Sequence, residues 1–327
     1  MKPFAYSRST SIAAAVAAGD APNVRFLGGG TNLIDLMRED IEHPDALVDI
    51  TAIPFFAISD RDDGGLSIGA GARNTAVAAH PSVRARYPLL SEAILCGASA
   101  QIRNMATVGG NLMQRTRCLY FYDQAARCNK RQPHSGCDAL GGFTRMHAIL
   151  GTSEACIATH PSDMCVALAA LDATVRIAGA SGERSVPVTD FHRLPAETPH
   201  LETVLEPGEL ITSVDVPPLD WAGRSTYRKV RDRSSYAFAL VSVAAAVSAR
   251  DGRIEEMRLA LGGVGTKPWR AFEAERHLRG AEVTNERVRF AIDAELAAAR
   301  TFRDNHFKIE LARRTVVSVV IGLIETS

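Results

Sequence analysis

Five of the six cysteines in this sequence of 327 residues lie between Cys118 and Cys165. The first four of these five follow the spacing C-x9-C-x8-C-x18-C and end at Cys156. Four thiolates can hold a zinc ion or an iron–sulfur cluster. Structural zinc sites usually contain a C-x2-4-C pair and ferredoxins a tight cysteine run, and neither is present. The spacing alone therefore does not identify the metal.

The segment that carries three of these thiols, RTRCLYFYDQAARCNKRQPHSGC at 115–137, has almost no hydrophobic periodicity. It is too polar to bury thiols in an ordinary core, but a four-thiolate cluster would order it without one. Free buried thiols are an alternative interpretation, as are disulfides, which a reducing cytoplasm disfavours. Cys96 and Cys165 stand in apolar, helix-like contexts and are interpreted as packing residues.

Two glycine-rich stretches can bring backbone N–H groups close to a phosphate. FLGGGTNL at 26–33 ends an apolar strand, and QIRNMATVGGNL at 101–112 repeats the pattern later in the chain. Glycines let the backbone approach a ligand, and successive N–H groups form an anion-binding nest. Neither stretch is a G-x-G-x-x-G fingerprint or a P-loop. Together they predict a site that binds the two ends of a dinucleotide. Each stretch alone could be an ordinary strand–helix turn.

Two charged residues outside these loops have open roles. ATHPSDM at 158–164 places Asp163 at a predicted helix start, where it could simply be an N-cap. YRKVRDRSSYAF at 227–238 is a compact set of positive charges, typical of a solvated face. Lys229 has apolar neighbours and could instead reach an anionic cofactor. The local sequence does not decide between these interpretations of Asp163 and Lys229.

Charge and hydropathy exclude several classes of protein. Lys plus Arg and Asp plus Glu both total 37, so no large field draws the chain to nucleic acid or to an anionic membrane surface. The longest apolar run, at 237–249, is shorter than the roughly 20 residues of a membrane helix. The N-terminus fits a strand, an N-cap at 9–11, a short helix and a stop at Gly19 better than a signal peptide. We expect a soluble protein without membrane insertion.

The apolar pattern predicts an α+β chain in two domains. Short strands alternate with small-residue helices in the first third, and residues 162–191 predict a helix that runs into a hairpin turning at Gly182. Prolines and a change in composition at 216–233 indicate a boundary, which gives domains 1–221 and 222–327. In the second domain we expect a small sheet with helices, including 271–279 and 284–300, on one face.

The motifs FLGGGTNLIDLM, IRNMATVGGNLMQRTRC, CIATHPSDMCVAL, PGELITSVDVP and YRKVRDRSSYAFALVSVAAAV together resemble the FAD-binding medium subunit of the xanthine dehydrogenase family of molybdenum hydroxylases. The resemblance covers essentially the whole chain. It is strongest to the flavin subunit of bacterial periplasmic aldehyde oxidoreductases, which carries an extra [4Fe-4S] cluster. The implied fold is a two-lobed FAD-binding domain of the vanillyl-alcohol-oxidase (PCMH) type, followed by a small α/β domain like that of CO dehydrogenase flavoproteins.

Carried over by position, the resemblance implies cofactor-binding residues and no catalytic residue of the chain's own. The first FAD loop would comprise Phe26, Leu27, Gly28, Gly29, Gly30, Thr31, Asn32, Leu33 and Ile34. Further FAD contacts would come from Thr107, Gly110, Asn111, Ile157, Asp163 and Lys229. An insertion at about 115–157 would supply the cluster ligands Cys118, Cys128, Cys137 and Cys156.

The resemblance also implies a function in electron transfer. A large partner subunit would oxidise an aldehyde at a molybdenum cofactor, and a small partner with two [2Fe-2S] clusters would pass electrons to FAD here, for release to an external acceptor. We expect the added cluster to be at least structural. The alternatives are a self-contained flavoenzyme with its own small substrate and a zinc-stapled interaction subunit without redox role. The family implies a periplasmic location through a partner's export signal, with the cytoplasm as the alternative.

Overall fold

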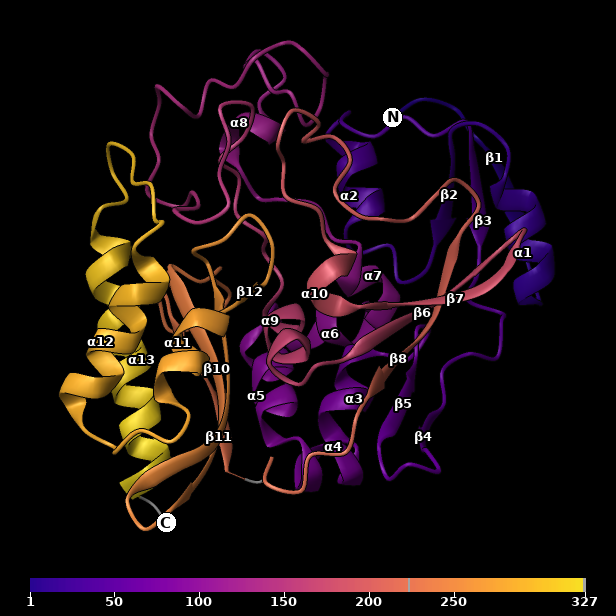
Figure 1. Cartoon of the computed structure of the whole chain (residues 1–327). Coiled ribbons are helices and arrows are strands. Elements are labelled where there is room, and N and C mark those ends of the chain that lie inside the picture. The colour runs from indigo at the N-terminus through magenta and orange to yellow at the C-terminus, as the bar shows by residue number, and fades with distance from the viewer. Residues whose placement is uncertain (223, 326–327) are drawn as a thin grey trace.

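The computed structural model describes residues 1–222 and 224–325, which form three sheets and the helices around them (Figure 1). The first lobe is a parallel sheet in the order β1-β3-β2. Its N-terminal helix begins as expected, because the Ser11 hydroxyl accepts a hydrogen bond from the Ala14 N–H at 3.2 Å. The elements of this lobe are β1 (Ala5–Arg8), α1 (Ile12–Gly19), β2 (Val24–Leu27), α2 (Leu33–Arg38) and β3 (Ala46–Asp49).

The second lobe is an antiparallel sheet in the order β4-β5-β8-β6-β7, covered by short helices. Its strands are β4 (Ile58–Asp60), β5 (Leu66–Gly69), β6 (Thr174–Gly179), β7 (Gly182–Pro187) and β8 (Leu210–Val216). Its helices are α3 (Asn74–Ala79), α4 (Pro81–Arg86), α5 (Pro88–Cys96), α6 (Ala100–Met105), α7 (Val108–Leu112), α9 (Asp163–Ala170) and α10 (Val188–Phe191). The predicted helix and hairpin at 162–191 are confirmed.

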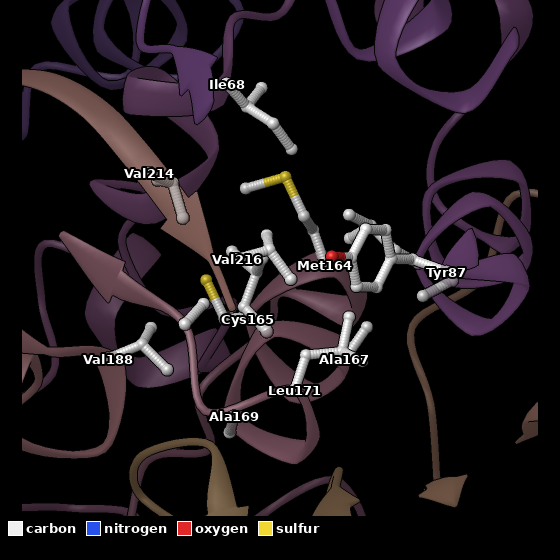
Figure 2. Close-up of a cluster of buried hydrophobic side chains, with 14 of the residues drawn as sticks. Ile68, Tyr87, Met164, Cys165, Ala167, Ala169, Leu171, Val188, Val214 and Val216 are labelled. Atoms are coloured by element: carbon white, nitrogen blue, oxygen red, sulfur yellow. The ribbon is translucent and has the colours of Figure 1, made fainter. Parts of the chain in front are cut away.

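Helix α9 lies at the centre of the molecule and is buried along its whole length. Its small and medium side chains pack against the sheet residues Val214 and Val216 (Figure 2). Cys165 belongs to this core and is fully buried, which confirms its interpretation as a packing residue. The N-cap of α9 is Ser162, whose hydroxyl accepts from the Cys165 N–H at 3.0 Å. The carboxylate of Asp163 is therefore not the cap and is available for other partners.

The cysteine-bearing segment runs over the top of the molecule in Figure 1, between the first lobe and the C-terminal helices. Its described secondary structure is confined to the single turn α8 (Leu119–Tyr122) and a bridge between Cys128 and Cys137. This agrees with the absence of hydrophobic periodicity in its sequence.

The C-terminal domain is an antiparallel sheet in the order β12-β11-β10-β9, and both of its faces are buried. Val243, Ala245 and Val247 of β10 face its own helices, whereas Ala244 and Ala246 face the core around α9. The prediction of helices on one face therefore described half of the packing, because the FAD-binding domain covers the other face. The elements are β9 (Ser225–Val230), β10 (Val241–Arg250), β11 (Arg253–Gly262), β12 (Trp269–Arg270), α11 (Phe272–Leu278), α12 (Asn285–Leu296) and α13 (Phe307–Glu325).

Helix α13 was not predicted, although its 19 residues make it longer than α12. Its second half contains the β-branched run TVVSVVI, which favours a strand on local propensity. Packing decides otherwise, because Val316, Val319 and Val320 are buried against the β10 face. Within the described part of the chain, no helix is both long and apolar enough to span a membrane.

Small residues on β10 let α9 approach the C-terminal sheet, and enlarging one should move the helix. Ala244→Leu adds volume at a site with no exposed surface and should cost about 1–3 kcal/mol of unfolding free energy. It should also weaken FAD retention, because α9 carries Asp163. Urea unfolding and the FAD-to-protein ratio measure both. The control Ala298→Leu lies on the exposed surface after α12; equal effects of the two substitutions would contradict this packing.

Candidate cofactor-binding site

The first glycine loop presents a row of backbone donors that the protein leaves unused. Among the described residues, no acceptor is hydrogen-bonded to the N–H groups from Gly28 to Asn32. The side-chain Nδ2 of Asn32 is also buried without a partner, while its Oδ1 accepts from the Arg115 N–H at 2.8 Å. Consecutive free N–H groups are suited to an anionic group such as a pyrophosphate. The loop residues therefore fit the phosphates of a dinucleotide.

The second glycine loop lies directly against the first. A Cβ built on Gly29 would come within 2.0 Å of the Met105 carbonyl oxygen, and one on Gly28 within 3.0 Å of Thr107 Oγ1. Here the N–H groups are satisfied internally, since Thr107 Oγ1 accepts from Gly110 N at 3.1 Å. Asn111 Oδ1 accepts from the Ser162 hydroxyl at 2.6 Å, which ties this loop to the start of α9. The two loops predicted to act together are adjacent in space.

A cavity of about 180 Å³ lies where the cysteine segment, the start of α9 and the C-terminal sheet meet. Leu119, Phe143 and Phe238 contribute apolar, partly exposed side chains to its lining. His160 and Asp163 contribute polar groups from the other side. An apolar slot with a few polar groups suits a flat aromatic ring system such as isoalloxazine. The residues present are compatible with FAD: the first loop would hold its phosphates, and this cavity would hold its ring.

Asp163, which lines this cavity, is held by two residues of β9. Lys229 Nζ lies 2.7 Å from Asp163 Oδ2, and the Tyr227 hydroxyl donates to Oδ1 at 2.5 Å. Burial, followed by the Asp163 charge, raises the pKa of Tyr227 well above its ordinary value, so the phenol stays a donor. Lys229 also donates to the Cys96 carbonyl at 3.2 Å. Lys229 thus lies behind Asp163 and outside the residues that line the cavity.

A second buried lysine, Lys308 of α13, holds the opposite walls of the cavity. Its Nζ donates to the carbonyl oxygens of His147 at 2.9 Å and Gly263 at 2.6 Å, and both residues line the cavity. Burial and then the charge of Arg145 lower the pKa of Lys308 to about 7. Among the described residues, Lys308 has no carboxylate partner. Its buried amine instead links the His147 and Gly263 carbonyls.

The four predicted ligand cysteines line one small cavity of their own. Cys118, Cys128, Cys137 and Cys156 enter it from widely separated points of the segment, together with Lys130. All six cysteines of the chain are free thiols, so the disulfide alternative is wrong. Two small apolar clusters accompany this cavity, one with Phe121 and Cys128 and one with Ala139 and Ile157. The expectation that the segment is too polar to bury a thiol in an apolar core is therefore wrong for Cys128, which is 7% exposed.

These sulfur atoms are too far apart for one metal ion. A tetrahedral zinc ion with Zn–S bonds of about 2.3 Å would hold its four ligands within about 4 Å of one another. Among the described residues, the one set of three or more candidate ligand atoms lying within 4.8 Å of one another is His160, Cys165 and His192. The donor set of four converging but separated thiols therefore fits a multi-iron cluster better than a zinc ion.

The burial of this cavity keeps its thiols neutral while no metal is bound. Burial raises the pKa of Cys118 to about 12 and that of Cys156 to about 11, so both thiols are protonated without a metal. Metal binding would displace these protons. Lys130 is the one positive charge that lowers the pKa of Cys156, and its Nζ is held by Glu202 at 2.6 Å. It can partly neutralise the negative charge that four thiolates bring.

The structure brings together most of the residues implied by the resemblance. Ile157 is different, because it is fully buried beside Cys118 and Cys137 and does not line the larger cavity, so its contact with FAD stays a prediction. Sequence reasoning missed His147 and Lys308. Neither residue stands in a recognisable motif. Lys308 lies in α13, which was not predicted because its valine-rich half favours a strand on local propensity.

The fold and the glycine loops define a dinucleotide-binding protein of the flavin type. Residues 2–219 match the family described as the FAD binding domain in molybdopterin dehydrogenase, and residues 225–323 match the CO dehydrogenase flavoprotein C-terminal domain. The predicted boundary at residue 222 falls between the two matches.

Individual relatives agree with these matches. The chain is 51% identical to the aldehyde oxidoreductase FAD-binding subunit PaoB of Escherichia coli K12, over 98% of both chains. It is 29% identical to the glyceraldehyde dehydrogenase medium chain of Sulfolobus acidocaldarius, over 97% of this chain and 95% of the other. A solved chain of the Hydrogenophaga pseudoflava carbon monoxide dehydrogenase aligns over 99% of both chains, with a TM-score of 0.77 and 25% identity.

The chain therefore belongs to the family of FAD-binding medium subunits of the molybdenum hydroxylases. It is a subunit of an oxidoreductase. The expected fold class is confirmed, namely a two-lobed FAD-binding domain followed by a CO dehydrogenase flavoprotein-type domain.

A substitution at the contact of the two loops tests the FAD site. Gly29→Ala places a Cβ against the Met105 carbonyl and should force the loops apart, at a cost of about 1–3 kcal/mol. Most of the bound FAD should be lost, as measured by flavin absorbance per chain after purification. Gly141→Ala is the control, because a Cβ there meets nothing within 4 Å. Full FAD content in Gly29→Ala would place the cofactor elsewhere.

The buried lysine predicts a specific dependence of stability on pH. The pKa of Lys308 is about 7 in the folded chain and about 10.4 in an unfolded one. Below pH 7 the amine is charged in both states, and the burial penalty is complete. Between pH 7 and 10 the unfolded chain binds the extra proton, so the penalty disappears and stability rises, with a slope of at most about 1.4 kcal/mol per pH unit.

Lys308→Met removes this titration. The difference in unfolding free energy, wild type minus variant, should therefore increase from pH 7 to pH 10 in urea titrations. The exposed residue Leu201 supplies the control Leu201→Met, which removes no titrating group, so the difference should stay constant. A constant difference for Lys308→Met as well would show that its amine titrates normally.

Proposed function

We propose that this chain is the FAD- and [4Fe-4S]-carrying electron-transfer subunit of a heterotrimeric, molybdenum-dependent aldehyde oxidoreductase. The 51% identity to the Escherichia coli aldehyde oxidoreductase subunit over the whole chain supports the assignment to aldehydes. A large partner with the molybdenum cofactor oxidises the aldehyde. A small partner with two [2Fe-2S] clusters delivers the electrons, and this chain passes them to an external acceptor.

Bound FAD supplies the redox chemistry, because it can accept electrons singly and release them in pairs. The residues of the chain bind and orient it. The free N–H groups from Gly28 to Asn32 hold the phosphates, and Asp163 is fixed at the ring cavity by Lys229 and Tyr227. Apolar side chains such as Phe143 and Phe238 limit the access of water to the ring. No general base for aldehyde oxidation is required in this chain.

The observation that carries the cluster assignment is the convergence of Cys118, Cys128, Cys137 and Cys156 on one cavity, with sulfur atoms too dispersed for a single ion. Thiolate ligation would add to the two small apolar clusters in ordering this segment. Lys130 beside Cys156 offers charge compensation.

For location, we propose the periplasm, reached as part of a complex exported through a partner's signal. The support is the resemblance of the sequence motifs to the flavin subunit of bacterial periplasmic aldehyde oxidoreductases. Fractionation of cells that express all subunits tests this proposal, and activity confined to the cytoplasm would contradict it.

The cofactor content is tested on the anaerobically purified complex. Flavin bands with about four irons and four acid-labile sulfides per chain are expected, the content of a cubane cluster. Cys128→Ser should lose the iron and, with the segment disordered, part of the FAD. Cys96→Ser is the matched control, because this half-buried thiol lies outside the cysteine cavity.

Three results would contradict the proposal in different ways. Flavin without iron in the wild type would leave a plain flavoprotein, and zinc without flavin would exclude a redox role. Bleaching of the flavin by an aldehyde in the isolated chain would indicate a self-contained flavoenzyme, since an electron-exit subunit should respond only in the complex.

A further inference from the structure

Two cavities lie next to each other: the cysteine cavity, which the four cysteines line, and the cavity of about 180 Å³ proposed for the flavin ring, here called the flavin cavity. Thr116 and Cys118 line both and form the wall between them. Thr116 is buried and holds this wall in place. Its hydroxyl donates to the Thr159 carbonyl at 3.1 Å and accepts from the Cys118 N–H at 3.2 Å. Of the four cysteines, Cys118 alone lines the flavin cavity as well.

His147 lines the flavin cavity and contacts the Cys118 sulfur from that side. Its Nε2 lies 3.1 Å from Cys118 Sγ, and the ring is 3% exposed. Nδ1 is buried and has no hydrogen-bond partner among the described groups. A proton on Nδ1 would leave a buried N–H donor without an acceptor, which costs more than an unpaired nitrogen lone pair. The tautomer with the proton on Nε2 is therefore favoured. In this tautomer, His147 donates to the sulfur.

The backbone of His147 is held from the C-terminal domain. The His147 carbonyl accepts from Lys308 Nζ at 2.9 Å and from Asn305 Nδ2 at 3.3 Å. Both donors belong to residues that are fully buried. The hydrogen bond to Cys118 is thus supported by a rigid second layer, as is common around tuned metal centres.

We propose that Cys118 and His147 form the electron contact between the [4Fe-4S] cluster and the flavin, with His147 as a positioning residue that raises the reduction potential of the cluster. The proposal rests on the proposed function, because it requires both cofactors. The step is a transfer of one electron. The reduced flavin loses it, the oxidised cluster gains it, the flavin keeps its proton, and no covalent bond forms or breaks.

A hydrogen bond to a ligand sulfur favours the reduced cluster, which carries one more negative charge. Among the four thiols, Cys118 is the one with an imidazole donor. Cys156 Sγ, by comparison, accepts only from the Ala158 N–H, at 3.4 Å. The tuned ligand is therefore the same one that borders the flavin. This makes the cluster a redox branch of the subunit in addition to a structural staple.

The test compares His147→Leu with His147→Gln in the complete complex. The leucine removes the donor, whereas the glutamine can return an N–H group to about the same place. In a redox titration followed by electron paramagnetic resonance, the midpoint potential of the cluster should become more negative in His147→Leu. The fraction of electrons on the cluster in half-reduced protein should also fall. His147→Gln should recover both values at least in part, with iron content equal to wild type.

A second measurement needs no variant. Reduction of the cluster should speed the spin relaxation of the flavin radical, seen as a higher saturating microwave power, because the two centres lie on either side of Cys118. The electron contact alone would be overturned by either of two results. One is an intact cluster whose midpoint potential is the same in wild type and His147→Leu. The other is a flavin radical whose spin relaxation does not change when the cluster is reduced. Absence of iron from the wild type would instead overturn the proposed function, and this proposal with it.

Discussion

The cofactor site depends on the buried ion pair between Asp163 and Lys229. Asp163 begins the central helix of the FAD-binding domain, and Lys229 lies on a strand of the C-terminal domain, so the pair joins the two domains beside the flavin cavity. The desolvation of two charges is offset only when every partner is present. The Tyr227 hydroxyl and the Cys96 carbonyl complete the arrangement. The same contact that fastens the domains therefore fixes a polar group of the cavity that we propose for the flavin ring.

The rest of the site is built on the same principle, in which the C-terminal domain positions groups of the FAD-binding domain. Lys308 holds the carbonyls of His147 and Gly263, and the alanines of β10 admit α9 to close packing. This suits a subunit whose cofactors perform the chemistry. In the proposed function, its side chains orient the flavin and limit the access of water. The buried charges of the chain hold neighbouring groups in position.

The cysteine segment is packed differently, because its buried side chains form two small clusters, one around Phe121 and one around Ile157. Its four thiols line one cavity, and the segment is anchored at its start by the hydrogen bond from the Arg115 N–H to Asn32. The opening of the segment thereby stays in register with the first FAD loop. Proximity of the two cofactor regions is thus a consequence of how the segment is attached.

The local sequence determined much of this protein. The glycine loops, the cap at Ser11 and the hairpin at Gly182 are short-range patterns, and each was predicted from residue types and spacing. The cysteine ligand set was implied by the family resemblance and stays a prediction. Only the tertiary structure decided that Ser162 and not Asp163 caps α9, that the valine-rich 307–325 is a helix, and that both faces of the C-terminal sheet are buried. It also brought His147 to Cys118 and Lys308 to the cavity walls. These contacts join residues far apart in the chain, and their energy comes from burial and desolvation, which no local pattern encodes.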